Sequence, residues 1–375
     1  MTSSSQTGVM HASRPLQALV DVDAMRHNLA QARARAGSRR VWAVVKANAY
    51  GHGIENAVRA FGDADGLAML EVGEAQRARA AGWRKPILLL EGVFETRDLE
   101  VTRELELTTV VHCDEQIAML EAVRDAGPIG VYLKVDTGMN RLGFAPAQFA
   151  AARARVAALA NVQVRALMTH IANGNRTDAP PSQSPWPTVQ GQHAALLALA
   201  PDWKGAWSVS NSAALFLHPA RGDEYVRPGI TLYGASPAAN VSAASLGLKA
   251  AMCLQARILA VRDLAKGECV GYGSLWRAPR RSRVGVVACG YADGYPRMAP
   301  EGTPVWSTGR LLHLIGRVSM DMVTVDLTEA ADVQAGSAVE LWGPHVPVDT
   351  VAERVGTVGY ELLSRLPARV REAAA

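Results

Sequence analysis

Short apolar segments alternate with longer stretches rich in Ala, Arg and Glu between about residue 41 and residue 234. The apolar segments are typical of buried strands, and stretches such as 71–81, 114–126 and 147–159 have helical spacing. Eight strands alternating with helices predict an α/β fold, a closed (β/α)₈ barrel of the TIM type rather than an open doubly wound sheet. The expected strands lie at 41–45, 66–70, 86–90, 107–111, 131–135, 164–168, 206–209 and 225–230.

After Gly234 the pattern changes to strands separated by Gly, Pro and Asp turns, which predicts a mostly β C-terminal domain. We expect an N-terminal tail over 1–14, a barrel over 15–240 and the C-terminal domain over 241–375. A helix at 24–36 precedes the barrel, and the strand-like segment 16–21 is free to pair with the C-terminal domain. The C-terminal strands are expected at 252–261, 284–288, 312–317, 322–325 and 339–342, the linker near 236–245, and a Pro-rich insertion at 179–187.

Composition narrows the class of protein. The net charge is +4, and the arginines are scattered, so nucleic acid is not an expected partner. No Gly-x-Gly-x-x-Gly follows the first strand, which argues against a dinucleotide fold. The chain begins without a signal peptide and has no run of membrane-spanning length, so we expect a cytoplasmic protein without a metal site. The four cysteines are spaced as separate, reduced thiols: Cys113, Cys253, Cys269 and Cys289.

The first barrel strand ends on Lys46, and a loop of small and polar residues follows it. A buried ammonium is costly unless its charge is paired or lost, and a desolvated amine can attack a carbonyl carbon. The alternative is a lysine whose aliphatic stem is buried while its head reaches water. The chain has only six lysines and uses arginine for most of its basic positions. A lysine kept within an apolar run, where an uncharged amine is possible, therefore favours a chemical role for Lys46.

Polar residues also follow the other barrel strands, at the end where barrel enzymes place their chemistry. Asn211 and Ser212 open a short helix, where free N–H groups and a hydroxyl suit a phosphate, although these residues taken alone favour a plain helix cap. The strand ends carry Glu71, Glu91, His112, Asp136 with Arg141, His170, Asn211 with Ser212, and Arg227.

The segment Ala-Val-Val-Lys-Ala-Asn-Ala-Tyr-Gly-His-Gly at 43–53 closely resembles the pyridoxal-phosphate lysine motif of the alanine racemases. Arg-Pro-Gly-Ile at 227–230, Val-Gly-Tyr-Gly at 270–273 and Gly-Tyr-Ala-Asp-Gly-Tyr-Pro-Arg at 290–297 match further family segments, in order, in both expected domains. The resemblance implies an enzyme that interconverts L- and D-alanine through an aldimine with pyridoxal 5'-phosphate. Such an enzyme either supplies D-alanine for peptidoglycan or catabolises it.

The resemblance also implies residue roles. Lys46 holds the cofactor and acts as one base, while Tyr272, from the second subunit of a homodimer, acts as the other. Arg227 faces the pyridine nitrogen, and His170 links Arg227 to Tyr272. Arg141 reaches the substrate carboxylate, and Lys134 matches a lysine that is often carbamylated. Phosphate contacts are implied for Tyr50, Asn211, Ser212, Gly229 and Ile230, a contact with the cofactor for Tyr360, and substrate contacts for Tyr291 and Met320.

Three alternatives belong to the same fold or cofactor class. A decarboxylase is disfavoured because related barrels carry glutamate where Arg227 stands, and a guanidinium can only donate to the ring nitrogen. Broad-specificity amino-acid racemases tend to be exported, so the missing signal peptide disfavours that alternative. Non-catalytic pyridoxal-phosphate carriers lack the β domain, so Tyr272 argues against that one. Two departures from the family are Ser208, where some members carry histidine, and Asn-Gly-Asn at 173–175 in place of a more acidic stretch.

Overall fold

The computed structural model describes residues 14–123, 127–176, 187–218 and 222–374. These form two compact units, one spanning Asp21–Ala251 and the other joining the segment up to Val20 with the chain from Met252 onward. The expected N-terminal tail, apart from Arg14, and nearly all of the Pro-rich insertion at 179–187 lie outside the described residues.

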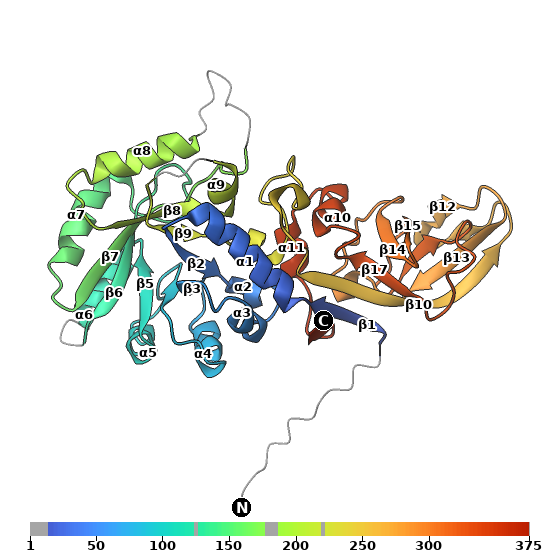
Figure 1. Ribbon diagram of the computed structural model, residues 1–375, viewed down its shortest axis with the longest axis horizontal. Coiled ribbons are helices and arrows are strands. Elements are labelled where there is room, and N and C mark those ends of the chain that lie inside the picture. The colour runs from blue at the N-terminus through green and yellow to red at the C-terminus, as the bar shows by residue number, and fades with distance from the viewer. Residues whose placement is uncertain (1–13, 124–126, 177–186, 219–221, 375) are drawn as a thin grey trace, which may run out of the picture. The chain divides into compact units, whose positions relative to one another are not determined.

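The first unit is a closed barrel of eight parallel strands, so the predicted fold class is confirmed (Figure 1). Every expected strand is present, with ends that differ by at most three residues. β9 ends three residues earlier than the expected strand 225–230. It stops at Arg227 because Pro228, which follows it, has no N–H to donate. The strands are β2 (Arg40–Val44), β3 (Gly66–Met69), β4 (Ile87–Leu89), β5 (Leu107–Val111), β6 (Ile129–Lys134), β7 (Val162–Met168), β8 (Ala206–Asn211) and β9 (Tyr225–Arg227).

Helices cover the outside of the barrel, and several begin at side-chain caps (Figure 1). Asp21 accepts a hydrogen bond from Ala24 N at 2.8 Å and starts α1, while Thr188 caps α8 and Asn211 caps α9 in the same way. The helices are α1 (Val22–Ala36), α2 (Lys46–Tyr50), α3 (Ile54–Ala60), α4 (Val72–Ala80), α5 (Asp98–Glu104), α6 (Asp114–Ala122), α7 (Pro146–Ala157), α8 (Val189–Leu199) and α9 (Ser212–Leu217).

The second unit is built on an eight-stranded sheet in the order β13-β16-β15-β14-β17-β10-β1-β18. β1 (Leu16–Val20), from the start of the chain, pairs antiparallel with β10 and parallel with β18. The other elements are β10 (Met252–Leu264), β11 (Cys269–Val270), β12 (Trp276–Arg277), β13 (Ser282–Val287), β14 (Pro304–Ser307), β15 (Arg310–Ile315), β16 (Val323–Asp326), β17 (Ala338–Trp342), β18 (Arg371–Ala374), α10 (Val348–Arg354) and α11 (Gly359–Ser364).

All four cysteines are free thiols. In the part of the chain that the structure describes, no helix combines the length and apolar character needed to cross a membrane.

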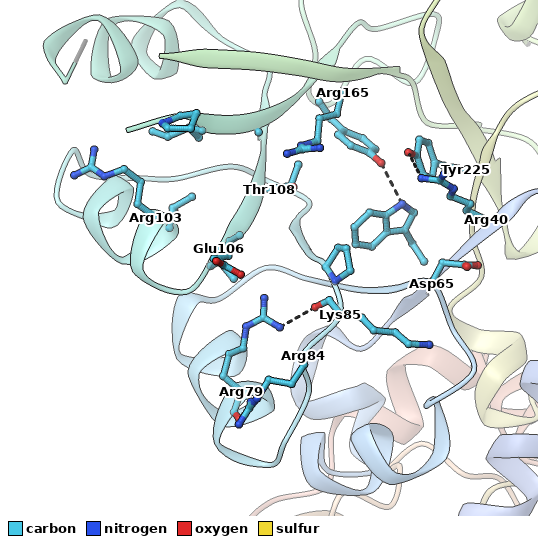
Figure 2. Close-up of a pocket in the computed structure, with 18 of the residues that line it drawn as sticks. Arg40, Asp65, Arg79, Arg84, Lys85, Arg103, Glu106, Thr108, Arg165 and Tyr225 are labelled. Atoms are coloured by element: carbon cyan, nitrogen blue, oxygen red, sulfur yellow. Dashed lines mark hydrogen bonds between the residues drawn. The ribbon is translucent and has the colours of Figure 1, made fainter. Parts of the chain in front are cut away.

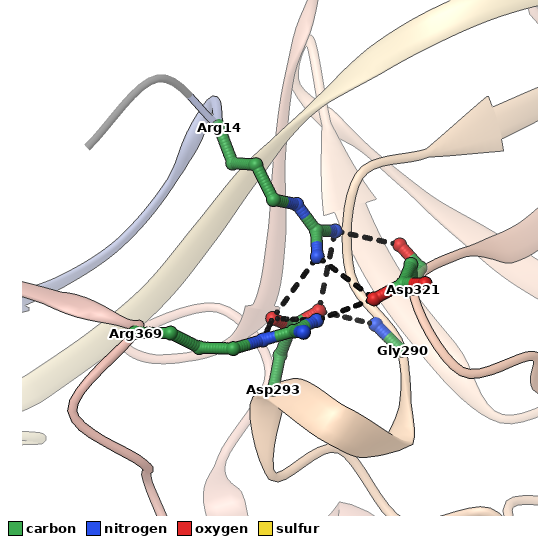
Figure 3. A network of polar contacts seen from close by, with 5 residues as sticks. All are labelled: Arg14, Gly290, Asp293, Asp321 and Arg369. Atoms are coloured by element: carbon green, nitrogen blue, oxygen red, sulfur yellow. Dashed lines mark hydrogen bonds and ion pairs between the residues drawn. The ribbon is translucent and has the colours of Figure 1, made fainter. Parts of the chain in front are cut away.

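A buried carboxylate ties together both ends of the second unit (Figure 3). Asp293 is 1% exposed and accepts hydrogen bonds from Arg369 Nε at 2.7 Å and Arg14 Nη1 at 3.3 Å. Both arginines also bind Asp321, and Asp293 accepts from Gly290 N at 2.9 Å. The network therefore fixes the loop that follows β13 against the loop that precedes β16.

Replacing Asp293 with Ala is expected to lower the free energy of unfolding by about 2 kcal/mol, because it leaves the buried Gly290 N–H without its acceptor and removes one of the two carboxylates that bind Arg14 and Arg369. Thermal unfolding followed by circular dichroism measures the loss. Asp332→Ala removes an exposed ion pair with Arg310 and serves as the control, with an expected loss below about 1 kcal/mol. Equal losses in the two variants would contradict a structural role for the buried carboxylate.

Candidate active site

Lys46 lies directly after β2, at the carboxyl end of the barrel strands. Burial lowers the pKa of Lys46, and the positive charge of Arg141 lowers it further. Glu91 and Glu74 act in the opposite direction, but burial is the largest of these effects. The amine is thus shifted toward the uncharged, nucleophilic form that carbonyl chemistry requires.

The residues after Lys46 form a left-handed turn within α2. Ala47, Asn48, Ala49 and Tyr50 all have φ between 52° and 54°. This conformation costs an L-residue roughly 1–2 kcal/mol. Hydrogen bonds from Ala49 N to Val45 O (2.8 Å) and from Asn48 N to Glu74 Oε1 (2.7 Å) hold the turn. Strain of this kind persists where the surroundings enforce it, and it concentrates at functional sites.

The turn directs Tyr50 into a small polar cradle. The Tyr50 ring stacks on Tyr233 with a centroid distance of 4.7 Å, and a Cβ added to Gly229 would lie 2.5 Å from Tyr50 Oη. The hydroxyl of Ser212 accepts a hydrogen bond from Gly229 N at 2.7 Å. Two hydroxyls thus approach the same stretch of backbone, where Ile230 begins a 3₁₀ turn, and the lack of a Cβ at Gly229 leaves room for Tyr50 Oη.

Asn211 is occupied by structural contacts. Its Oδ1 caps α9 through Ala214 N (3.0 Å), and its Nδ2 donates to Ile171 O (3.2 Å). Asn211 therefore acts as the cap of α9 and presents Ser212 at the cradle, while its contact with the cofactor stays a prediction.

Arg227 ends β9 and is 4% exposed. Its guanidinium donates to Ser208 Oγ, to Thr169 O at 2.8 Å and to Val209 O at 3.2 Å. Burial lowers the pKa of Arg227 to about 10, so the group keeps its charge at neutral pH. Ser208 is thus a hydrogen-bond partner of this arginine, at the position where some family members carry histidine.

Lys134 ends β6, His170 lies two residues beyond the neighbouring strand β7, and both line one cavity together with Arg141. Burial, followed by the charges of Arg227 and Arg141, lowers the pKa of Lys134 to about 8. Burial also holds the pKa of His170 well below its ordinary value, and Arg227 and Lys134 add to this effect. The mouth of the barrel therefore carries a neutral imidazole among cationic groups.

Two contributors to the site were not singled out from the sequence. Gln192, on α8, is fully buried and donates to Thr137 Oγ1 (3.1 Å) and His170 O (3.0 Å), which joins the loops after β6 and β7. Glu74, on α4, supports the left-handed turn through Asn48 N. A polar residue inside a helix carries no sequence signal that separates these roles from ordinary surface positions.

The remaining predicted site residues belong to the second unit. Tyr272 lies between Gly271 and Gly273, whose φ angles are 71° and 76°, and it is 71% exposed. Tyr291 and Met320 are also exposed, whereas burial raises the pKa of Tyr360. Tyr291 N donates to Ser319 O at 3.0 Å, so the loops of Tyr291 and Met320 lie side by side.

A closed parallel barrel with a desolvated amine and a buried guanidinium at the carboxyl ends of its strands defines a barrel enzyme built for carbonyl and carboxylate chemistry. Sequence comparison narrows the class. The alanine racemase N-terminal domain matches residues 20–237, and the alanine racemase C-terminal domain matches residues 251–374.

Individual relatives agree with these matches. Alanine racemase of Janthinobacterium sp. (strain Marseille) is 49% identical over 358 residues, covering 96% of this chain and 98% of the relative. The crystal structure of biosynthetic alanine racemase from Pseudomonas aeruginosa is 45% identical with a TM-score of 0.91, covering 96% and 99%. Alanine racemase from Bartonella henselae with covalently bound pyridoxal phosphate is 27% identical with a TM-score of 0.84, covering 96% and 99%. The chain belongs to the alanine racemase family, a family of isomerases.

Proposed function

We propose that the protein interconverts L-alanine and D-alanine with pyridoxal 5'-phosphate held on Lys46. The observation that carries this proposal is the depressed pKa of the Lys46 amine at the mouth of a parallel barrel. The Bartonella relative carries its pyridoxal phosphate covalently, which supports the same attachment here.

The residues at the barrel mouth fit this cofactor. Lys46 offers an amine for its aldehyde, and the cradle of Tyr50, Ser212 and Gly229 offers donors for its phosphate. The Arg227 guanidinium donates to two backbone carbonyls and to Ser208. These bonds fix its orientation, and with it the direction of its remaining N–H donors. Because a guanidinium cannot accept a proton, Arg227 would keep the pyridine nitrogen unprotonated.

Inversion of a stereocentre needs a proton acceptor on one face and a proton donor on the other. When bound, pyridoxal phosphate supplies an electron sink that makes the α-proton of an amino acid acidic. Lys46 Nζ would exchange that proton on the D side, and Tyr272 Oη on the L side. Arg141 would bind the substrate carboxylate and fix the amino acid between these two groups.

Tyr272 would reach the site from a second copy of the chain. The second unit exposes several large apolar side chains that contact with a partner would remove from water, among them Tyr272, Leu275, Tyr291, Met298, Met320 and Met322. We therefore propose a homodimer in which each active site draws residues from both subunits. The similarity to the Pseudomonas aeruginosa enzyme, which is named biosynthetic, supports a role in supplying D-alanine.

Reduction of the holoenzyme with borohydride is expected to fix the cofactor on one lysine. Peptide mapping should place the label on Lys46, because its amine is the one shifted toward the neutral form beside the cradle. The untreated enzyme should convert L-alanine to D-alanine, measured with a D-amino-acid oxidase assay, and Lys46→Ala should abolish this conversion. A label on another lysine would contradict the attachment site.

Mixed dimers of Lys46→Ala and Tyr272→Phe chains test the shared active site. Lys46→Ala alone should be inactive, and Tyr272→Phe alone should lose activity by roughly 10²–10⁴-fold because it lacks a proton-transfer group. After subunit exchange, a statistical mixture should recover about 25% of wild-type activity, because half of the dimers then hold one complete site. No recovery in a mixture that demonstrably forms hybrid dimers would show that both groups come from one chain.

We also propose that Lys134 carries a carbamate. Its pKa of about 8 means that the neutral amine, which attacks carbon dioxide with loss of a proton, becomes the major form above that pH. A carbamate resonance in ¹³C-bicarbonate should therefore grow as the pH rises through 8 and should be absent in Lys134→Met. Lys204→Met changes an exposed lysine and serves as the control, which should retain the carbamate signal. A carbamate signal that persists in Lys134→Met would contradict the assignment.

A further inference from the structure

A second pocket lies at the opposite end of the barrel from Lys46. It has a volume of about 600 Å³ and is lined by Arg40, Leu107, Gly130 and Tyr225, which lie at the starts of β2, β5, β6 and β9. Because the barrel strands are parallel, their starts share one end and their carboxyl ends share the other. The pocket is therefore separate from the residues assigned to racemisation, and its volume suits a small organic ligand.

The lining of this pocket is strongly cationic. Figure 2 shows the basic side chains approaching from different sides of the pocket. Asp65 and Glu106 are the acidic residues of the lining, and Asp65 is already paired with Arg33 at 3.1 Å. Within the described residues, none of the lining cations forms an ion pair. These cations are Arg40, Arg79, Arg84, Lys85, Arg103 and Arg165.

Glu106 offsets part of the charge of Arg79, whereas the hydrogen bonds of the other lining cations to neutral groups leave their charge uncompensated. Lys85 Nζ donates to the carbonyls of Gly62 (2.6 Å) and Ala64 (3.0 Å), and Arg84 likewise donates to main-chain carbonyls. Arg103 Nη1 is buried without any hydrogen-bond partner. Neutral carbonyls satisfy donors but do not cancel positive charge, so the pocket keeps a field that attracts anions.

An aromatic cluster backs the wall, with Trp42 and Tyr132 buried and Tyr225 partly exposed. Trp42 Nε1 donates to Tyr132 Oη at 3.1 Å, and the rings of Tyr132 and Tyr225 lie 5.6 Å apart. The guanidinium of Arg40 lies 5.7 Å from the centre of the Tyr225 ring. Gly130 makes room for a further cation, because a Cβ at this position would lie 2.5 Å from Arg165 Nε. Arginines beside aromatic rings suit a planar ligand that bears phosphate groups.

We propose that this pocket binds a phosphorylated small molecule with a planar ring, such as a nucleotide. The phosphate groups would contact the arginines, and the ring would lie against Tyr225, the partly exposed member of the aromatic cluster. This site is independent of racemisation and of the phosphate cradle beside Lys46.

Isothermal titration of the holoenzyme at low ionic strength, with ADP and with pyrophosphate, tests the proposal. Both should bind, and added salt should weaken both. The variant Arg84→Gln/Arg165→Gln should weaken ADP binding by about tenfold or more, because it removes two charged donors from the pocket. Both arginines are exposed, so the variant should fold and keep its racemase activity.

Arg280→Gln/Arg281→Gln provides the matched control. It removes the same charge from exposed positions on the second unit, where the arginines pair with Glu329 and Asp263. ADP affinity in this control should stay within about twofold of the wild type. Absence of ADP binding, equal weakening in the two double variants, or binding of a dicarboxylate such as succinate in preference to both phosphates would overturn the proposal.

Discussion

The site depends on withdrawing several cationic groups from water at one end of the barrel. Burial and the repulsion between like charges lower the pKa of each group. Whether a group then loses its charge depends on its pKa in water. Lys134 falls to a pKa of about 8, and Lys46 shifts in the same direction. Arg227 starts so high that it remains charged at a pKa of about 10. One physical effect therefore yields nucleophilic amines beside a permanent cation.

Such an arrangement is stable only if the buried cation is well supported. The Arg227 guanidinium donates to two backbone carbonyls and to a serine hydroxyl. One of the carbonyls belongs to Thr169, the residue before His170. Gln192 in turn bonds His170 O and Thr137. The contacts form a continuous network across β7, β8 and β9, so loosening one partner would disturb several site residues at once.

The barrel was predictable because strands buried on both faces leave continuous apolar runs in the sequence. β4, with the sequence Ile-Leu-Leu, is apolar and buried at every position. The C-terminal sheet was predicted less completely. β14 begins at a proline, and β11 and β12 have only two residues each, too few for a periodic pattern.

The candidate active site was also predicted only in part from the sequence. Residues at strand ends, such as Lys46 and Arg227, were identifiable because polar groups stand out after apolar runs. The helix residue Gln192 was not, since its contacts depend on how α8 packs against the barrel. The bond from Arg227 to Ser208 likewise joins neighbouring strands, which sequence position alone does not pair at atomic detail.

The left-handed turn after Lys46 was hidden for another reason. Alanine favours the right-handed region, so Ala-Asn-Ala gives no hint of an inverted backbone. The inversion also means that this stretch follows the path natural to residues of opposite chirality. A semisynthetic chain with D-alanine at positions 47 and 49 would thus adopt the same path without its conformational penalty, an unusual case in which the mirror-image building block suits a native fold better than the encoded one.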